Sequence, residues 1–240
     1  MRLDKFLCDQ NIGTRSQVKE FIKKGQVTVN GQAVRKPETK VDELSDTVVC
    51  QGQPIQYRKY TYYMLNKPEG VVSATNDNTA PTVVSLLTVP EQKDLFPVGR
   101  LDKDTTGLLL LTNDGALCHD LLSPRKHVDK TYLVTPGKPL SMEDIHRLEQ
   151  GLDIGDENLT APAKAELTEN GDLLLTIHEG RFHQVKRMLQ AVDNQVLTLE
   201  RISFGPLSLD PSLKRGSYRA LTEEEVAALS ALQQKQKENQ

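Results

Sequence analysis

The sequence of 240 residues predicts an α+β fold in two parts. A small N-terminal domain of helices and hairpins is expected over residues 1–59, with its linker, and a larger domain over residues 60–232. In the larger part, hairpin signals outnumber strand pairs separated by a helix, which favours a mixed, mainly antiparallel sheet with flanking helices. Charge also divides the chain: residues 1–59 hold 11 Lys and Arg against 7 Asp and Glu, whereas the rest holds 19 against 26.

Local patterns in the first part predict a helix followed by a hairpin. Thr14-Arg-Ser-Gln17 has the form of a capping box, apolar residues recur after it at helical spacing, and Gly25 is well placed to end the helix. Asn30-Gly31 between two short β-prone runs is typical of a tight hairpin turn. A basic helix beside a hairpin is expected to meet a polyanion.

Basic side chains are placed regularly on these elements. Arg15, Lys19 and Lys23 are four residues apart, so a helix brings them to one face, where they can contact phosphates. Such contacts position RNA without reading its sequence. The residues expected to bind RNA are Arg2, Lys5, Arg15, Lys19, Lys23 and Arg35. The alternative is an ordinary solvated surface on a small structural domain.

In the second part, strands are predicted over residues 60–65 and 128–135, and a hairpin is predicted from residues 163–168 and 172–177 around Asn170-Gly171. Ser141-Met-Glu-Asp144 caps a helix that Gly151 ends, and Thr222-Glu-Glu-Glu225 opens the last helix. Residues 233–240 are rich in Gln and Lys and are expected to form a flexible tail.

The most informative segment runs from Gly99 to Gly115. A polar loop carrying Arg100 and Asp102 leads into four consecutive leucines, which end at an Asn-Asp-Gly turn. Such a run between turn signals suits a strand buried on both faces, and that strand can hold the loop rigidly. An acid fixed there beside a guanidinium is a candidate nucleophile. The alternative is a plain buried strand whose entry loop uses its Asp and Thr side chains to bond its own backbone.

This segment resembles the catalytic motif of RsuA-type pseudouridine synthases: Gly-Arg-Leu-Asp, two residues, Thr-x-Gly-Leu, a leucine-rich strand and Asn-Asp-Gly. Residues 1–48, with Met1-Arg-Leu-Asp-Lys-Phe-Leu and Gly25-Gln-Val-Thr-Val-Asn-Gly31, resemble the small RNA-binding domain named after ribosomal protein S-four. That domain commonly precedes the catalytic domain in such enzymes. The resemblance implies that Asp102 is the catalytic nucleophile or base.

Three further segments resemble the same family. Lys67-Pro68-x-Gly70 resembles its first motif and is assigned no catalytic role. Lys130-Thr-Tyr132 resembles the strand with the active-site tyrosine, which could stack on uracil or relay a proton. Gly180-Arg-Phe-His-Gln184 precedes Lys186, which matches the basic residue that pairs with the catalytic aspartate and keeps it ionised. The resemblance thus implies that Asp102, Tyr132 and Lys186 are catalytic, and the residues expected to bind substrate are Arg100, Arg181, His183 and Gln184.

The implied function is the isomerisation of a uridine in ribosomal RNA to pseudouridine on a flipped-out base. Small-subunit RNA is the expected target, and large-subunit RNA is the alternative. The reaction involves no redox step or group donor, so we expect no cofactor; the three cysteines lack metal-ligand spacing, so we expect no metal. With no membrane-spanning apolar run, we expect a cytoplasmic monomer whose partner is ribosomal RNA in an assembly intermediate.

Three other functions are weighed against this one. A non-catalytic RNA-binding ribosome-assembly factor would be favoured if the carboxylate, the tyrosine or the basic partner were missing, but all three are present. An RNA methyltransferase needs a glycine-rich strand-to-helix turn, which the sequence lacks. A glycosidase needs two separated carboxylates, whereas Asp102 and Asp104 lie in one loop with strong basic company.

Overall fold

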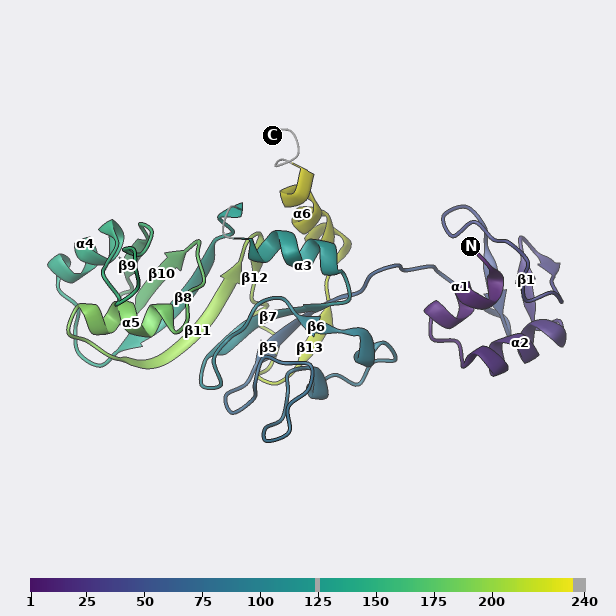
Figure 1. The fold of residues 1–240 in the computed structure, drawn as a ribbon, viewed down its shortest axis with the longest axis horizontal. Helices are drawn as coiled ribbons and strands as arrows, with labels where there is room; N and C mark the ends of the chain where they lie inside the picture. The colour runs from purple at the N-terminus through teal and green to yellow at the C-terminus, as the bar shows by residue number, and fades with distance from the viewer. Residues whose placement is uncertain (124–125, 235–240) are drawn as a thin grey trace. The chain divides into compact units, whose positions relative to one another are not determined.

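The structure is a computed structural model that describes residues 1–123 and 126–234. The chain folds as two compact units, Met1–Thr61 and Tyr62–Gln240, which are described separately (Figure 1). Most of the expected flexible tail lies outside the described residues. Within the part that the structure describes, no helix has the length and apolar character needed to cross a membrane.

The first unit packs two helices on a four-stranded antiparallel sheet of order β2-β1-β3-β4. Its elements are α1 (Leu3–Asp9), α2 (Arg15–Lys23), β1 (Val27–Val29), β2 (Gln32–Ala33), β3 (Val48–Cys50) and β4 (Gln53–Ile55). The predicted capping box is confirmed, because Thr14 and Gln17 bond each other's backbone N–H. The predicted turn is confirmed too: Asn30 and Gly31 have φ of 51° and 80°, the positive values that a two-residue hairpin needs.

The second unit holds a nine-stranded sheet with the central order β13-β5-β7-β11-β8-β10-β9. Its strands are β5 (Tyr62–Lys67), β6 (Phe96–Pro97), β7 (Thr106–Thr112), β8 (Lys130–Pro136), β9 (Lys164–Leu167), β10 (Leu173–Ile177), β11 (Val196–Phe204), β12 (Leu207–Ser208) and β13 (Tyr218–Ala220). β7 and β11 pair in parallel, and the other strand pairs are antiparallel. The predicted mixed, mainly antiparallel sheet is confirmed.

Helices cover this sheet on both faces. They are α3 (Gly115–Leu122), α4 (Met142–Gln150), α5 (Gln184–Ala191) and α6 (Glu223–Gln234), with short 3-10 turns η1 (Val84–Leu86) and η2 (Gln92–Asp94). In Figure 1, α4 and α5 lie beside β8, β10 and β11, whereas α3 and α6 lie together near β12. The helix predicted after the Ser141 capping box is confirmed, and Gly151 ends it at a φ of 94°.

The four leucines of β7 are fully buried, as predicted, and they alternate between two cores. Leu108 and Leu110 pack in a cluster with residues of α3 and α6. Leu109 and Leu111 pack in the larger cluster, which includes residues of α4 and α5. Because side chains on both faces are buried, β7 is a rigid support for the loop that precedes it.

Two structural features at the ends of β7 were not predicted from the sequence. The Asn-Asp-Gly segment, predicted as a turn, starts α3: Asp114 caps that helix by accepting a hydrogen bond from the Leu117 N–H at 3.1 Å. At the other end of the strand, Gly107 has a φ of 96°, and a Cβ there would lie 2.3 Å from the Arg201 carbonyl oxygen. Glycine therefore allows β7 and β11 to pair closely just after the polar loop.

Candidate active site

The loop that carries Asp102 joins β6 to β7 and is held by a fully buried lysine from β5. Lys67 Nζ donates to the carbonyl oxygens of Asp102 at 3.0 Å, Lys103 at 3.3 Å and Thr105 at 2.8 Å. Its ammonium therefore fastens the loop backbone at Asp102 and on the C-terminal side of that residue. Burial lowers the pKa of Lys67 to about 8, although the nearby Asp104 and Asp102 oppose the shift.

Two more contacts complete this support. Ser73 Oγ donates to the Leu101 carbonyl at 2.8 Å and lies 3.0 Å from the Leu101 nitrogen, which donates back to it. The Gly70 N–H donates to the Lys103 carbonyl at 2.8 Å. The Lys67-Pro68-x-Gly70 motif thus positions the loop that carries Asp102. No catalytic role was expected for this motif. The signal for its structural role is a lysine inside an apolar strand, since a buried ammonium needs several acceptors.

Asp102, the candidate catalytic carboxylate, forms an ion pair with Lys186. Lys186, in the first turn of α5, places Nζ 3.3 Å from Asp102 Oδ2, although the two residues are far apart in the sequence. The same Nζ lies 2.6 Å from Asp104 Oδ1 and 2.9 Å from Asp104 Oδ2. His183 Nε2 lies 3.6 Å from Asp102 Oδ1. The structure thus brings the two residues together and adds Asp104, which sequence reasoning treated as an ordinary loop residue.

Lys186 and Asp104 shift each other's pKa values towards the charged forms. Partial burial works to lower the pKa of Lys186, but its bonds to Asp104 and Asp102 outweigh burial, so the pKa lies above its ordinary value. The hydrogen bond from Lys186 lowers the pKa of Asp104. The Lys186 ammonium thus lies within ion-pair distance of both Asp102 and Asp104, and a carboxylate at such a position can act as a nucleophile or a base.

A pocket opens beside this cluster, and Arg100, Asp102, Tyr132, His183 and Lys186 lie along it. Apolar side chains of Leu101, Ile177, Val185 and Leu199 complete much of its wall. Tyr132, in the middle of β8, is buried. A pocket lined by charged, aromatic and apolar side chains suits a flat, polar ring such as a nucleobase.

Sequence reasoning gave no role to two buried polar residues, one beside the pocket residue Tyr132 and one in the pocket wall. Arg201 of β11, opposite Tyr132 in the sheet, interacts with the Tyr132 phenol and donates from Nε to the Leu108 carbonyl at 2.8 Å. Thr105, which lines the pocket, is 1% exposed, and its Oγ1 has no hydrogen-bond partner among the described residues. The interpretation of this segment as a plain loop expected its Thr side chains to bond the loop backbone. The Thr105 hydroxyl makes no such bond.

Comparisons with known proteins identify the families of both units. A family described as RNA pseudouridylate synthase matches residues 61–191, and the S4 domain matches residues 1–48. The chain belongs to the RNA pseudouridylate synthase family. The predicted resemblance to RsuA-type pseudouridine synthases with an N-terminal S4 domain is confirmed, and the protein is an enzyme of that family.

Relatives and a solved structure match the pseudouridine synthase over nearly its whole length. The uncharacterized RNA pseudouridine synthase YtzG of Bacillus subtilis is 49% identical over 96% of this chain and 98% of its own. Ribosomal small subunit pseudouridine synthase A is 42% identical in Vibrio cholerae, over 95% of this chain and 99% of its own, and 43% identical in Escherichia coli, over 95% and 100%. A crystal structure of a pseudouridylate synthase, 38% identical, covers 95% of this chain and 99% of its own with a TM-score of 0.68.

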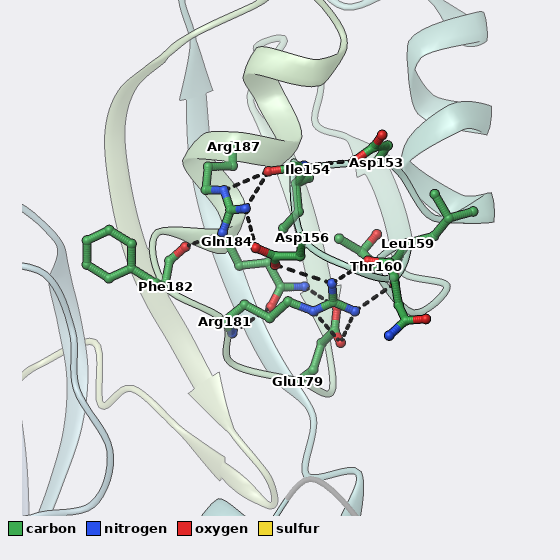
Figure 2. A network of polar contacts seen from close by, with 12 residues as sticks. Asp153, Ile154, Asp156, Leu159, Thr160, Glu179, Arg181, Phe182, Gln184 and Arg187 are labelled. Carbon is green, nitrogen blue, oxygen red and sulfur yellow. Dashed lines mark hydrogen bonds and ion pairs between the residues drawn. The ribbon is translucent and has the colours of Figure 1, made fainter.

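Two residues expected to bind the substrate of this synthase are engaged inside the protein. The Arg181 guanidinium contacts Glu179 and Asp156 and donates to the carbonyls of Asn158 and Leu159 at 2.7 and 2.6 Å (Figure 2). Gln184 is buried and donates to Glu179 Oε1 at 2.6 Å. These bonds fasten the loop before α5. In contrast, Arg100 is exposed and makes no ion pair with any described residue.

The six basic residues expected to bind RNA differ in how their charges are used. In the S4 domain, Arg2 pairs with Asp4 at 2.8 Å and Lys5 pairs with Asp9 at 2.6 Å. Arg15, Lys19 and Lys23 are exposed on α2, and Arg35 donates weakly to the Lys23 carbonyl at 3.4 Å. Among these six residues, Arg15, Lys19 and Lys23 therefore keep their charges unpaired on the exposed face of α2, within the part of the chain that the structure describes.

In the part of the chain that the structure describes, no three His, Cys, Asp or Glu side chains gather in a way that could hold a metal ion.

Proposed function

We propose that this enzyme isomerises a uridine of small-subunit ribosomal RNA to pseudouridine, with Asp102 as nucleophile or base. The observation that carries the proposal is the Asp102 carboxylate at the pocket, 3.3 Å from the Lys186 ammonium, in a loop fastened by Lys67. The target is supported by relatives at 42–43% identity that are named ribosomal small subunit pseudouridine synthase A.

The chemistry needs few groups. The bond between the ribose C1′ and uracil N1 breaks, the base turns, and C1′ joins C5. The C5 position loses a proton and N1 gains one, so atoms and electrons balance without a group donor. Asp102 supplies the nucleophile or base that frees the uracil, and Lys186 stabilises it as the carboxylate. Tyr132, supported by Arg201, is placed to stack on the base and to relay the proton.

Other side chains hold the RNA and the loops. A base inside a helix cannot react, so the target uridine must be flipped into the pocket, at a cost of a few kcal/mol. Arg100, which is exposed at the pocket, is placed to occupy the vacated space or to bind the adjacent phosphate. We assign Arg181 and Gln184 to positioning the loop that presents His183 and Lys186, because their polar atoms bond protein groups.

The S4 domain is proposed to hold the RNA through α2. Its exposed Arg15, Lys19 and Lys23 supply contacts to phosphates that do not depend on base sequence. The partner is then ribosomal RNA within an assembly intermediate in the cytoplasm, with the enzyme acting as a monomer. Base selection is left to the pocket of the larger unit.

The test compares pseudouridines in ribosomal RNA from cells with and without the gene, and from cells complemented with Asp102→Asn. The proposal predicts that one position in small-subunit RNA loses its pseudouridine and that only the wild-type gene restores it. Loss from large-subunit RNA would reassign the substrate. Unchanged modification of both subunits, together with retained RNA binding, would favour the non-catalytic assembly factor.

A further inference from the structure

The loop before α5 presents an aromatic side chain to solvent next to the catalytic cluster. Phe182 is 76% exposed, and it is the one aromatic among the most exposed large apolar side chains of the described residues. Its ring stacks on the His183 ring, with 3.8 Å between ring centroids and 19° between planes. Figure 2 shows Phe182 pointing away from the polar network that holds the loop.

This pair is fixed in place. His183 has a φ of 49°, a left-handed conformation that a non-glycine residue adopts when its surroundings enforce it. Arg187 Nη1 donates to the Phe182 carbonyl at 3.1 Å, while its Nη2 bonds Asp156 at 2.5 Å. The backbone that carries both rings is therefore anchored to the loop at Asp156, so the exposed ring does not simply follow a mobile segment.

The stack also leads into the pocket. His183 is the ring covered by Phe182 on one side, and its Nε2 lies 3.6 Å from Asp102 Oδ1. A planar apolar surface next to a catalytic carboxylate suits a nucleobase, because every base has a π-face and stacking tolerates any sequence. Aliphatic side chains lack this geometry, so an exposed Phe here is well suited to single-stranded RNA.

We propose that Phe182, backed by His183, is a stacking platform for a nucleobase flanking the flipped-out uridine. The proposal rests on the proposed function, because it assumes an RNA strand at the pocket. A base stacked on Phe182 holds the unpaired strand open and guides the target uridine towards Asp102. Phe182 is then a positioning residue for the RNA and takes no part in the chemical step.

The sequence contains no tryptophan, which allows a direct test with the full-length enzyme. Phe182→Trp places a single tryptophan at the platform, excited at a wavelength where the six tyrosines absorb little, and Met142→Trp places one on α4 at a side chain of matched exposure, 75%. With transcribed small-subunit ribosomal RNA, the proposal predicts strong quenching of the first and little quenching of the second. Equal quenching of the two variants at saturating RNA would overturn it.

Kinetics give a second readout that a merely structural residue would not reproduce. Phe182→Ala is expected to weaken RNA binding and to raise KM about tenfold, the scale of one lost stacking contact, with kcat nearly unchanged. Phe182→Trp restores KM, and Met142→Ala leaves it unchanged. If Phe182→Ala kept the wild-type KM, the stacking platform would be refuted, whereas the proposed function would stand. If the wild-type enzyme bound RNA but made no pseudouridine, the proposed function would fail, and the fluorescence arm would still decide on the platform.

Discussion

Lys186 contacts Asp104 more closely than it contacts Asp102: its Nζ lies 2.6 Å from Asp104 Oδ1 and 3.3 Å from Asp102 Oδ2. Asp104 is the more exposed of the two carboxylates, at 60% against 28% for the side chain. The outer carboxylate therefore orients the ammonium, while the inner one faces the pocket with a weaker bond. If Asp102 is the reacting acid, as proposed, the longer contact lets Lys186 stabilise its negative charge without a short hydrogen bond that would restrain the carboxylate.

Asp104→Asn is expected to lower kcat by less than about tenfold, since Lys186 loses an orienting partner but keeps Asp102. Because the Asp104 side chain is largely exposed, the free energy of unfolding should fall by less than about 1 kcal/mol. Lys186→Met, which removes the cation from both carboxylates, should reduce kcat further. Equal losses in single-turnover assays of the two variants would argue against this division of roles.

The alkaline limb of the pH profile is expected to come from Lys67, whose pKa lies at about 8. As pH rises through that value, its ammonium loses a proton and one donor to the loop carbonyls, so kcat/KM should fall. Lys130 also has a pKa of about 8, but it donates to the Val128 carbonyl at 2.6 Å. The limb should therefore persist in Lys130→Met and disappear in Lys67→Met. A limb that survives in Lys67→Met would assign it elsewhere.

The effect of Lys67 on stability has the opposite sign. Its pKa is lower in the folded chain than the ordinary value of 10.5, so the unfolded chain binds more protons between about pH 8 and 10.5. In that window the contribution of Lys67 to the free energy of unfolding rises with pH. Urea unfolding across this window should therefore show a steeper gain in stability for the wild type than for Lys67→Met, and equal slopes would contradict this assignment.

Thr105→Val tests the buried hydroxyl at the pocket wall. Because Thr105 Oγ1 has no partner among the described residues, the free enzyme should lose no stability and could gain up to about 1 kcal/mol. If the hydroxyl bonds the bound RNA, KM should rise severalfold. Thermal unfolding and steady-state assays measure the two effects, and a destabilised variant with wild-type KM would contradict this role.

The RNA-binding face proposed for α2 predicts a specific salt dependence. Replacing Arg15, Lys19 and Lys23 together with Gln should reduce the slope of log affinity against log salt concentration by about 2, because each phosphate contact contributes roughly 0.7 to 0.9. Lys5→Gln is the matched control, because Lys5 already pairs with Asp9 at 2.6 Å. An equal change in the control would mean that the whole domain, and not α2, carries the contacts.

Much of the fold was predictable because its signals are local. A capping box needs residues three apart, and the Asn30-Gly31 turn needs two neighbours, so both could be read directly. The pair Lys5–Asp9 was equally local and predictable, because opposite charges four residues apart meet on a helix. The pair Arg2–Asp4 joins residues only two apart, so it is local as well. Asp114 was ambiguous, since the same residue type favours a turn and a helix N-cap.

The active site was predictable only in part because its contacts span the sheet. Spacing cannot show that Lys186 meets Asp102, and the resemblance to a known family supplied that pair. Nothing local indicated that the same ammonium prefers Asp104, or that the guanidinium of Arg181 bonds the loop at Asp156. Such partners follow from which strands and helices pack together, which only the folded chain reveals.

The most direct test of the account is pseudouridine formation by Asp102→Asn on small-subunit ribosomal RNA. The variant should fold, melt and bind RNA like the wild type while its rate falls at least about 1,000-fold, because the amide cannot act as nucleophile or base. Asp104→Asn, in the same loop, should remain active under the same conditions. Pseudouridine formation by Asp102→Asn at a rate comparable to the wild type would contradict the central claim.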